Sequence, residues 1–349
     1  MIHSKLKKMV FALGILISPI YLQAQENSAL KLSVSELFDL VKKNHPTLKV
    51  SESDVQIAEQ NIKVAKNQFL PEISTGLQGY YLGDAHIIDK DFSNSSRVDM
   101  PNFGNKFSVE ARQLIWKGGV VKNAVEIQNL KKDLSQLNYE SNELNIKLLS
   151  AGYYLDLFKL YNQEKVYHKN IELAQERLDN INKFYKQGMV TRNDVIRGEL
   201  QLSNLKLALQ VVQNNQSILN KQLTVALGLD EGVKIIPDES IVTESLEILP
   251  LASYYGDLVN HPTIKQTEKA VDIYAVSEKI SRSDMMPSLS AFAGNTLQRP
   301  ITTSNPAMDM YTNGWSAGLS LNFNIDALFK APKKIQLNRK KKKKAIRQS

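Results

Sequence analysis

The stretch "NHPTLKVSESDVQIAEQNIKVAKNQFLPEIS" at residues 44–74 returns in a second version 216 positions later. Residues 260–290 match it without gaps at 11 of 31 positions, including the whole of "NHPT". Unrelated sequences agree at roughly 1 position in 17, so the similarity indicates an internal repeat. The chain is therefore expected to contain a duplicated structural unit.

The first copy predicts a helix followed by strands. A helix is expected over 33–68, with a break at His45, because a residue that precedes proline is disfavoured in the α conformation. After Pro71 the apolar residues alternate with polar ones, which is the strand period. A strand pair over 72–116 is predicted, with the polar stretch 83–105 as its connecting loop.

A helical hairpin is predicted over 119–227, after the motif "WKGG" (116–119). Apolar residues recur every three or four positions along its first helix, at Leu130, Leu134, Leu137, Leu144, Leu148, Ala151, Leu155 and Phe158. A seam this long is typical of coiled-coil packing, and the return helix is expected to bury it. The turn lies in "KQGMVTRNDV" (186–195), where Gly188 suits a helix C-terminus and Thr191 an N-cap.

The second half begins again after a predicted linker, 233–250. A helix broken at the second "NHPT" is expected over 251–285, followed by a strand pair over 288–325. Its last strand, "WSAGLSLNFNI" (315–325), alternates apolar and polar residues over 11 positions, which matches the ~9–11 residues of a transmembrane strand. A half-buried strand of a soluble protein alternates in the same way, so that alternative stays open.

The excess of positive charge in the chain lies at its two ends. The net charge is +8, but three lysines fall within the first eight residues and ten basic residues fall in 330–349, whereas all 36 acidic residues lie between. The body is mildly acidic, which argues against a nucleic-acid partner. The absence of cysteine excludes disulfides, thiolate metal sites and a lipidated N-terminal cysteine.

The N-terminal segment is predicted to be a signal peptide, residues 1–24. Lys5, Lys7 and Lys8 precede the apolar stretch 9–22, which is short for a membrane span. A retained N-terminal anchor is the alternative, and the cleavage site near Ala24 is not fixed by the pattern.

Four strands are too few for a closed membrane barrel. Open strand edges are not tolerated in lipid, and the smallest single-chain barrels have about 8 strands. An oligomeric barrel is therefore expected, with Glu110 and Arg112 facing a shared lumen; a plain solvated polar face is the alternative. Aromatic residues are expected at the membrane interfaces, at Tyr80, Tyr81, Trp116, Tyr311 and Trp315.

The order of these features resembles the TolC-type outer-membrane efflux proteins over roughly residues 30–330. The resemblance rests on "NHPT…FLP" and its second copy, on "WKGG" before the long helix and on "GMVTRNDV" at the hairpin turn. It implies a mainly α fold with membrane β: a long antiparallel coiled-coil hairpin plus two strand pairs that contribute to an oligomeric transmembrane barrel. It also implies a homotrimer with a shared twelve-stranded barrel, embedded in outer-membrane lipid, whose helical part lies in the periplasm.

The same resemblance implies that the protein conducts substrates and catalyses no reaction. The chain would be the outer-membrane channel subunit of a tripartite efflux or type I secretion system, passively conducting substrates from an inner-membrane pump. The hairpin turn would contact a periplasmic adaptor protein; an ordinary helix–helix turn is the alternative. The residues so implied are Gly188, Met189, Val190, Thr191 and Asp194.

The resemblance divides the chain into a first repeat (25–232), the linker, an incomplete second repeat (251–330) and a basic tail (331–349). The second repeat lacks a hairpin, so a truncated helix or a frameshifted end is expected, with a natural short form as the alternative. A periplasmic coiled-coil adaptor or scaffold and a non-functional fragment are the competing interpretations. The sequence has no histidines with metal-ligand spacing, no phosphate-binding loop and no nucleophile motif. We therefore predict that the protein is not an enzyme and needs no cofactor or metal.

Overall fold

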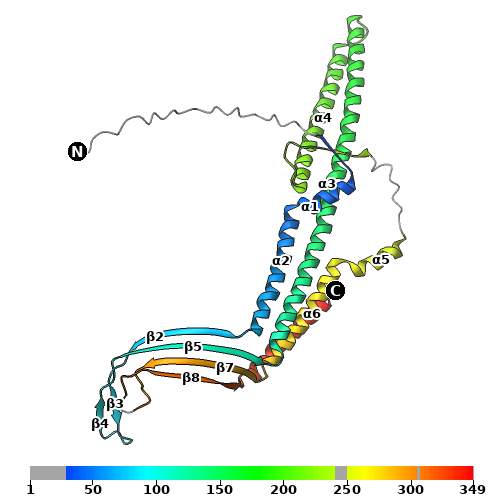
Figure 1. Ribbon diagram of the computed structural model, residues 1–349. Helices are drawn as coiled ribbons and strands as arrows, with labels where there is room; N and C mark the ends of the chain where they lie inside the picture. Colours follow the sequence, from blue (N-terminus) through cyan, green and yellow to red (C-terminus); the bar gives the residue numbers. More distant parts are fainter. Residues whose placement is uncertain (1–28, 240–249, 305–306, 349) are drawn as a thin grey trace, which may run out of the picture. The chain divides into compact units, whose positions relative to one another are not determined.

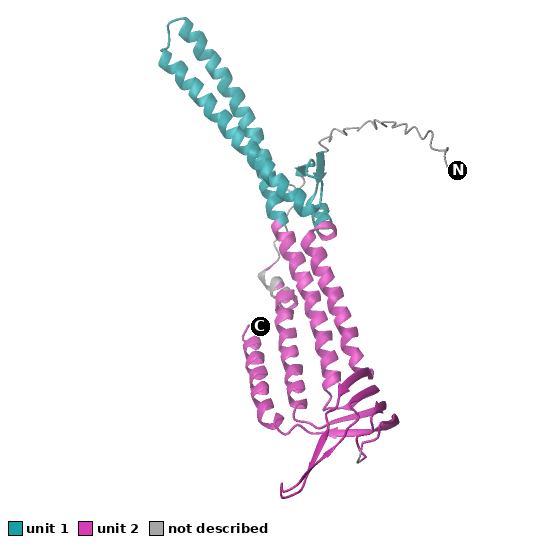
Figure 2. Cartoon of the chain, turned by 90° about the vertical axis from the view of Figure 1, so that its left-hand side faces the viewer, with its two compact units in different colours: residues 1–41, 150–244 teal, residues 42–149, 245–349 magenta. Residues whose placement is uncertain are grey.

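The computed structural model describes residues 29–239, 250–304 and 307–348 (Figure 1). The predicted signal peptide lies outside these residues, as does most of the predicted linker. The described residues form two compact units (Figure 2): unit 1 comprises 29–41 and 150–239, and unit 2 comprises 42–149, 250–304 and 307–348. Each unit draws on segments from both halves of the sequence.

Unit 1 holds the helical hairpin, made by the second half of α3 (Val120–Lys186) and by α4 (Arg192–Leu227). Its seam is apolar, and Leu178, Leu202 and Leu223 are buried in it. Gly198 allows the two helices to approach closely, because a Cβ there would lie 2.9 Å from Cδ1 of Leu178. The glycine that interrupts the leucine spacing of α4 is therefore a packing residue.

A polar contact inside the hairpin explains why the polar residue Gln216 stands at a seam position of α4. Gln216 is buried, and its Nε2 donates to Glu164 Oε2 at 2.8 Å, while Gln213 Nε2 donates to Glu164 Oε1 at 2.9 Å. Desolvation opposes the ionisation of Glu164, but these two hydrogen bonds, aided by His168 and Lys234, outweigh it and lower its pKa. A carboxylate with two amide donors can thus stay ionised in a mainly apolar seam.

A small parallel sheet completes unit 1. β1 (Ala29–Leu32) pairs with β6 (Lys234–Pro237), and α1 (Val34–Asn44) follows β1. The fully buried Tyr154 links both strands: its hydroxyl donates to the carbonyl of Leu32 at 2.7 Å and accepts from the amide of Asp238 at 2.9 Å. The expectation of a plain linker is therefore wrong for residues 234–237.

Unit 2 combines helices with the large sheet. Its helical elements are α2 (Pro46–Lys66), the 3₁₀ turn η1 (Asn67–Phe69), the first half of α3, α5 (Leu251–Asn260), α6 (Pro262–Ser283) and α7 (Ala327–Ile346). Asn142 on α3 donates to the Ser51 hydroxyl on α2 at 3.0 Å, and Gln266 on α6 donates to the carbonyl of Leu137 on α3 at 3.1 Å. The first half of α3 therefore packs against α2 and α6 rather than against α4.

This division of α3 corrects the predicted seam. Leu144, Leu148 and Leu155 were expected to be buried against the return helix, but their exposed fractions are 46%, 74% and 50%. For Leu144 and Leu148 the reason is length: α4 has 36 residues and α3 has 67, so α4 can pair only with about the second half of α3. Leu155 lies within that half but on another side of the helix, because Tyr154 and Leu157 are the buried residues there.

The repeated "NHPT" starts a new helix in each half of the chain, as predicted. His45 is the N-cap of α2 and His261 is the N-cap of α6, and a proline occupies the first helical position in both. Each imidazole Nδ1 accepts the amide N–H two residues later, from Thr47 at 3.2 Å and from Thr263 at 3.3 Å. The matching geometry shows that the sequence repeat is also a structural repeat at these two positions.

The large sheet has four antiparallel strands in the order β2 (Glu72–Tyr81), β5 (Phe103–Trp116), β7 (Ser288–Arg299) and β8 (Thr312–Asn322) (Figure 1). β8 ends at Asn322, three residues before its predicted end, because its partner β7 begins at Ser288 directly after Pro287. The predicted loop between β2 and β5 contains a second hairpin, β3 (Ala85–Ile88) and β4 (Ser95–Val98). The helices that connect directly to the sheet, which are α2 through η1, α3, α6 and α7, do so at one end, and the loops within each strand pair lie at the other (Figure 1).

None of the helices in the described part of the chain has both the length and the apolar character needed to cross a bilayer.

Candidate functional site

The four-stranded sheet has one continuous apolar face. In the observed register, residues directly opposite each other on neighbouring strands share a face, so the apolar sets of all four strands coincide. Several large side chains on this face are exposed by two thirds or more: Ile73 (71%), Leu77 (80%), Trp315 (81%), Leu319 (67%) and Leu321 (69%). An apolar surface of this extent indicates contact with lipid or with another protein surface.

The opposite face is polar and carries both residues predicted to line a lumen. Glu110 lies between Ser74 on β2 and Gly294 on β7, and Arg112 lies between Glu72 and Phe292. Both predicted side chains are exposed. The structure therefore places Glu110 and Arg112 together on one polar face, although their assignment to a lumen stays a prediction.

Two aromatic residues on the polar face cover glycines. The ring of Phe292 lies over Gly318, where a Cβ would come within 3.1 Å of Phe292 Cζ. Tyr80 covers Gly104 in the same way, and its hydroxyl donates to the carbonyl of Arg299 at 3.3 Å. Phe292 therefore interrupts the alternation of β7. Tyr80 lies on the polar face, whereas Tyr81 and Trp315 lie in the register of the apolar face.

Both edges of the sheet are unpaired within the chain. β2 and β8 are the outer strands of the order β2-β5-β7-β8, so each has a row of backbone groups without a strand partner among the described residues. Unpaired edges next to an exposed apolar face are normally avoided in soluble proteins. The edge strands β2 and β8 can therefore each pair with a further strand.

The connection from the sheet to α3 depends on two glycines. Gly118 and Gly119 have φ values of 53° and 75°, in the left-handed region that other residues rarely adopt. Ser283 on α6 donates its hydroxyl to the carbonyl of Gly118 at 2.6 Å. The two glycines of the "WKGG" motif therefore form the turn that enters α3, and this turn is fixed against α6.

The hairpin turn begins with a Schellman motif at the end of α3. Gly188 has φ 75°, and its N–H donates to the carbonyl of Tyr185 at 2.9 Å. The N–H of Met189 donates to the carbonyl of Phe184 at 3.0 Å. These are the two hydrogen bonds of that motif, so Gly188 has a structural role, while the Met189 side chain is 59% exposed.

A capping box starts α4 on the other side of the turn. The amide and hydroxyl of Thr191 both donate to Asp194 Oδ2, at 2.9 and 2.7 Å, and the amide of Asp194 donates to the Thr191 hydroxyl at 3.4 Å. Hydrogen bonds from the Thr191 side chain and backbone lower the pKa of Asp194. Of the five residues predicted to contact an adaptor, Gly188, Thr191 and Asp194 hold the turn, and Met189 takes part in it only through its backbone N–H, which leaves its side chain exposed.

A second apolar stripe on α4 was not recognised in the sequence. Its six members are all about half exposed: Ile196, Leu200, Leu207, Val211, Ile218 and Val225. At 100° per residue they fall within a sector of about 60°, on the side of α4 opposite to the buried seam. Their spacing of four and seven residues was the signal that could have revealed them. We call this set the outer stripe.

Within residues 29–239, 250–304 and 307–348, no three His, Cys, Asp or Glu side chains gather as metal ligands would.

Comparisons with known proteins agree with this geometry. The family model "Outer membrane efflux protein" matches residues 37–229. A curated relative, the outer membrane efflux protein BepC of Brucella suis, is 21% identical over 285 residues, which are 81% of this chain and 58% of BepC. The chain therefore spans less than two thirds of the length of that relative.

Solved structures show the same fold. The outer-membrane channel OprN superposes with a TM-score of 0.69 at 14% identity, covering 90% of this chain and 69% of OprN. The CmeC outer membrane channel of Campylobacter jejuni gives 0.66 at 16% identity, covering 92% of this chain and 66% of CmeC. The fold predicted from the TolC resemblance is confirmed, and these relatives are channels rather than enzymes.

Proposed function

Because the chain belongs to the outer membrane efflux protein family, we propose that it is the outer-membrane subunit of a channel that passively conducts substrates received from an inner-membrane pump. The pump would belong to a tripartite efflux or type I secretion system. The observation that carries the proposal is the two-faced, open-edged sheet. A sheet with one exposed apolar face, one polar face and two free edges suits a segment of a transmembrane barrel.

The free edges require further strands, which we assign to other copies of this chain. Three copies with four strands each would supply the twelve strands that the TolC resemblance implies. Glu110 and Arg112 would then lie on the inner, water-filled side, and the Leu319 side of β8 would face lipid.

The outer stripe of α4 supports the same assembly for the helical part. α4 buries one apolar side against α3 and exposes a second on the opposite side. A helix with two opposite apolar sides suits a closed ring of helices, in which each helix has a neighbour on both sides. We propose that a neighbouring copy covers the outer stripe.

The hairpin turn is the proposed contact for a periplasmic adaptor. Gly188, Thr191 and Asp194 would keep the turn in one conformation, and Met189 and Val190 would supply the contacting surface. Preorganisation of this kind lowers the entropic cost of binding.

The test is the location and mass of the full chain expressed in a Gram-negative host. Outer-membrane fractionation followed by native mass spectrometry in detergent should give a membrane-bound complex of three copies. Planar-bilayer recordings of that complex should show ion conductance. A monomer in the soluble periplasmic fraction would overturn the proposal in favour of the scaffold interpretation.

A further inference from the structure

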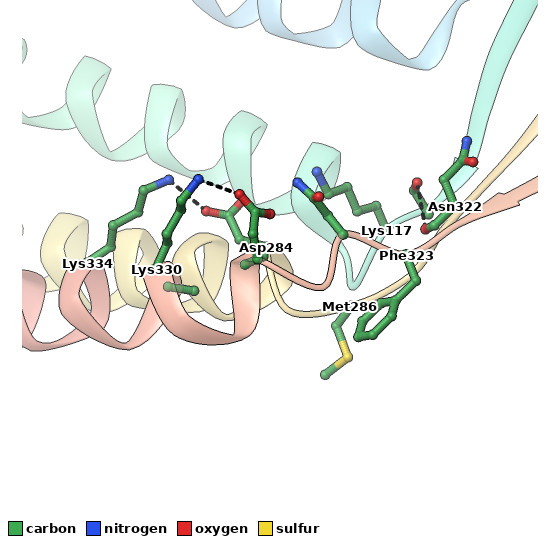
Figure 3. Close-up of a pocket in the computed structure, with 12 residues that line it drawn as sticks. Lys117, Asp284, Met286, Asn322, Phe323, Lys330 and Lys334 are labelled. Atoms are coloured by element: carbon green, nitrogen blue, oxygen red, sulfur yellow. Dashed lines mark hydrogen bonds and ion pairs between the residues drawn. The ribbon is translucent and has the colours of Figure 1, made fainter.

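A cavity of about 590 Å³ lies in unit 2, where the sheet meets α6 and α7 (Figure 3). Its lining includes Ser288 and Asn322, which stand opposite each other on β7 and β8. By the alternation of the strands, both share a face with Ser290 and Ser320. The cavity therefore lies on the polar side of the sheet, which the proposed function assigns to the water-filled lumen.

A β-bulge in β5 turns Lys117 to this polar side. The pairing of β5 with β7 shifts between Leu114 and Trp116, so that Trp116 stands opposite Leu289 of the apolar face. Because successive side chains point to opposite faces, the next residue, Lys117, leaves the strand on the polar side and lines the cavity. Without the bulge, strict alternation would place Lys117 on the apolar face.

The cavity holds one more ammonium group than carboxylate. Lys334 Nζ pairs with Asp284 Oδ2 at 3.0 Å, and Lys330 pairs with Asp326 at the start of α7. Lys117 is half-buried and makes no ion pair with any residue that the structure describes. Two of the three ammonium groups are thus neutralised, and the charge of Lys117 is left over.

This surplus charge lies among polar groups. Figure 3 shows that Lys117 extends toward the two ion pairs, whereas Met286 and Phe323 point away from the lysines. An unpaired ammonium group in such a polar recess attracts anions from the surrounding water and repels cations.

The sheet itself adds no net charge to this side. Its polar face carries two acidic and two basic side chains, and one pair of them, Glu72 and Arg112, stands directly opposite on β2 and β5. The other two are Lys106 and Glu110, both on β5. Of the charged groups on the polar face and in the cavity, Lys117 is therefore the one that nothing balances.

We propose that Lys117 makes the channel favour anions, so that solutes with carboxylate or phosphate groups pass the junction of sheet and helices more readily than cationic ones. This inference rests on the proposed function, since it needs the polar side of the sheet to face a lumen. In an assembly of several copies, the Lys117 side chains would form a ring of positive charge at one level of that lumen. Rings of lysine or arginine make pores selective for anions.

The experiment measures ion selectivity of the purified complex in planar bilayers under a gradient of KCl. The reversal potential gives the ratio of chloride to potassium permeability. We expect Lys117→Gln to lower this ratio about twofold near 0.1 M salt, where a charge acts over about 10 Å. Near 1 M salt the difference should vanish, because the screening length falls to about 3 Å.

Two variants serve as controls. Lys117→Arg keeps the charge and should keep the wild-type ratio, which a role of Lys117 in packing alone does not predict. Lys343→Gln removes an exposed lysine that, at 100° per residue, lies on the side of α7 opposite to Lys334 and does not line the cavity. Its ratio should also equal that of the wild type.

The outcomes separate this inference from the proposed function. Equal permeability ratios for the wild type and Lys117→Gln, in complexes that conduct, would overturn the inference and leave the proposed channel standing. An equal decrease in Lys343→Gln would overturn it as well, because the effect would then not belong to the cavity. A complex that conducts ions in no variant would overturn the proposed function, and the inference with it.

Discussion

Replacement of Gly118 by alanine should destabilise the protein more than replacement of its neighbour Gly119. Both glycines have positive φ, so each alanine carries a conformational cost of about 1–2 kcal/mol. A Cβ on Gly119 would meet only Asn123 Nδ2 at 3.7 Å, an ordinary contact. A Cβ on Gly118 would lie 3.0 Å from Met286 Cγ and 3.2 Å from Ser283 Cα, and relief of such overpacking costs about 1–3 kcal/mol.

The expected free-energy losses are therefore about 1–2 kcal/mol for Gly119→Ala and about 2–5 kcal/mol for Gly118→Ala. Urea unfolding of the detergent-solubilised protein, followed by far-UV circular dichroism, would measure both, provided that the slopes agree. The comparison isolates packing against α6, since the conformational cost is common to both variants. Equal losses would refute the claim that this turn is fixed against α6.

Three further predictions test other parts of the structure. Folding lowers the pKa of Glu164, so the ionised carboxylate stabilises the folded state fully above its ordinary pKa of 4.5. This stabilisation is lost as the pH falls through the pKa of the folded state. Glu164→Gln should therefore make the melting temperature less dependent on pH below about pH 5. Thr191→Ala should cost about 0.5–2 kcal/mol and raise hydrogen exchange in the first turn of α4, whereas Met189→Ala should change stability little and weaken adaptor binding measured by pull-down. Leu77→Arg on the apolar face should reduce the free energy of folding into lipid vesicles by about 2–4 kcal/mol. Gln78→Arg on the polar face is the control, and equal losses of folding free energy for the two variants would contradict the assignment of the faces.

The helix break at "NHPT" was predictable because proline restricts the residue before it. The capping role of the histidine was not, since histidine is not among the preferred N-cap residues. The strands were also predictable, because apolar and polar residues alternate from Trp315 through the rest of β8 and, less strictly, along β2.

The pairing of β1 with β6 was not predictable from local pattern. Each strand has four residues, and Ala29 pairs with Lys234, more than 200 positions away. Such short segments carry no period, and their pairing is decided by packing around Tyr154. The β3–β4 hairpin was not predicted either, because its strands are equally short and its polar residues resemble those of a loop.

The apolar periodicity of a helix does not identify the element that packs against it. A repeating apolar spacing predicts that a helix has a buried side, but it does not say which element covers that side. Along α3 the partners of the helix change from α2 and α6 in unit 2 to α4 in unit 1, and the apolar spacing does not reveal which of them covers a given turn. Leu148 follows the spacing and is 74% exposed in the single chain.

The central claim is that one face of the sheet meets lipid and the other meets water, and the absence of cysteine makes this directly measurable. Leu319→Cys and Ser316→Cys place single thiols on opposite faces of β8, at positions that are both exposed in the chain. In outer-membrane vesicles a membrane-impermeant, water-soluble maleimide should label Ser316→Cys and leave Leu319→Cys unlabelled, whereas a lipid-soluble maleimide should label Leu319→Cys. Rapid labelling of Leu319→Cys by the water-soluble reagent would contradict the claim.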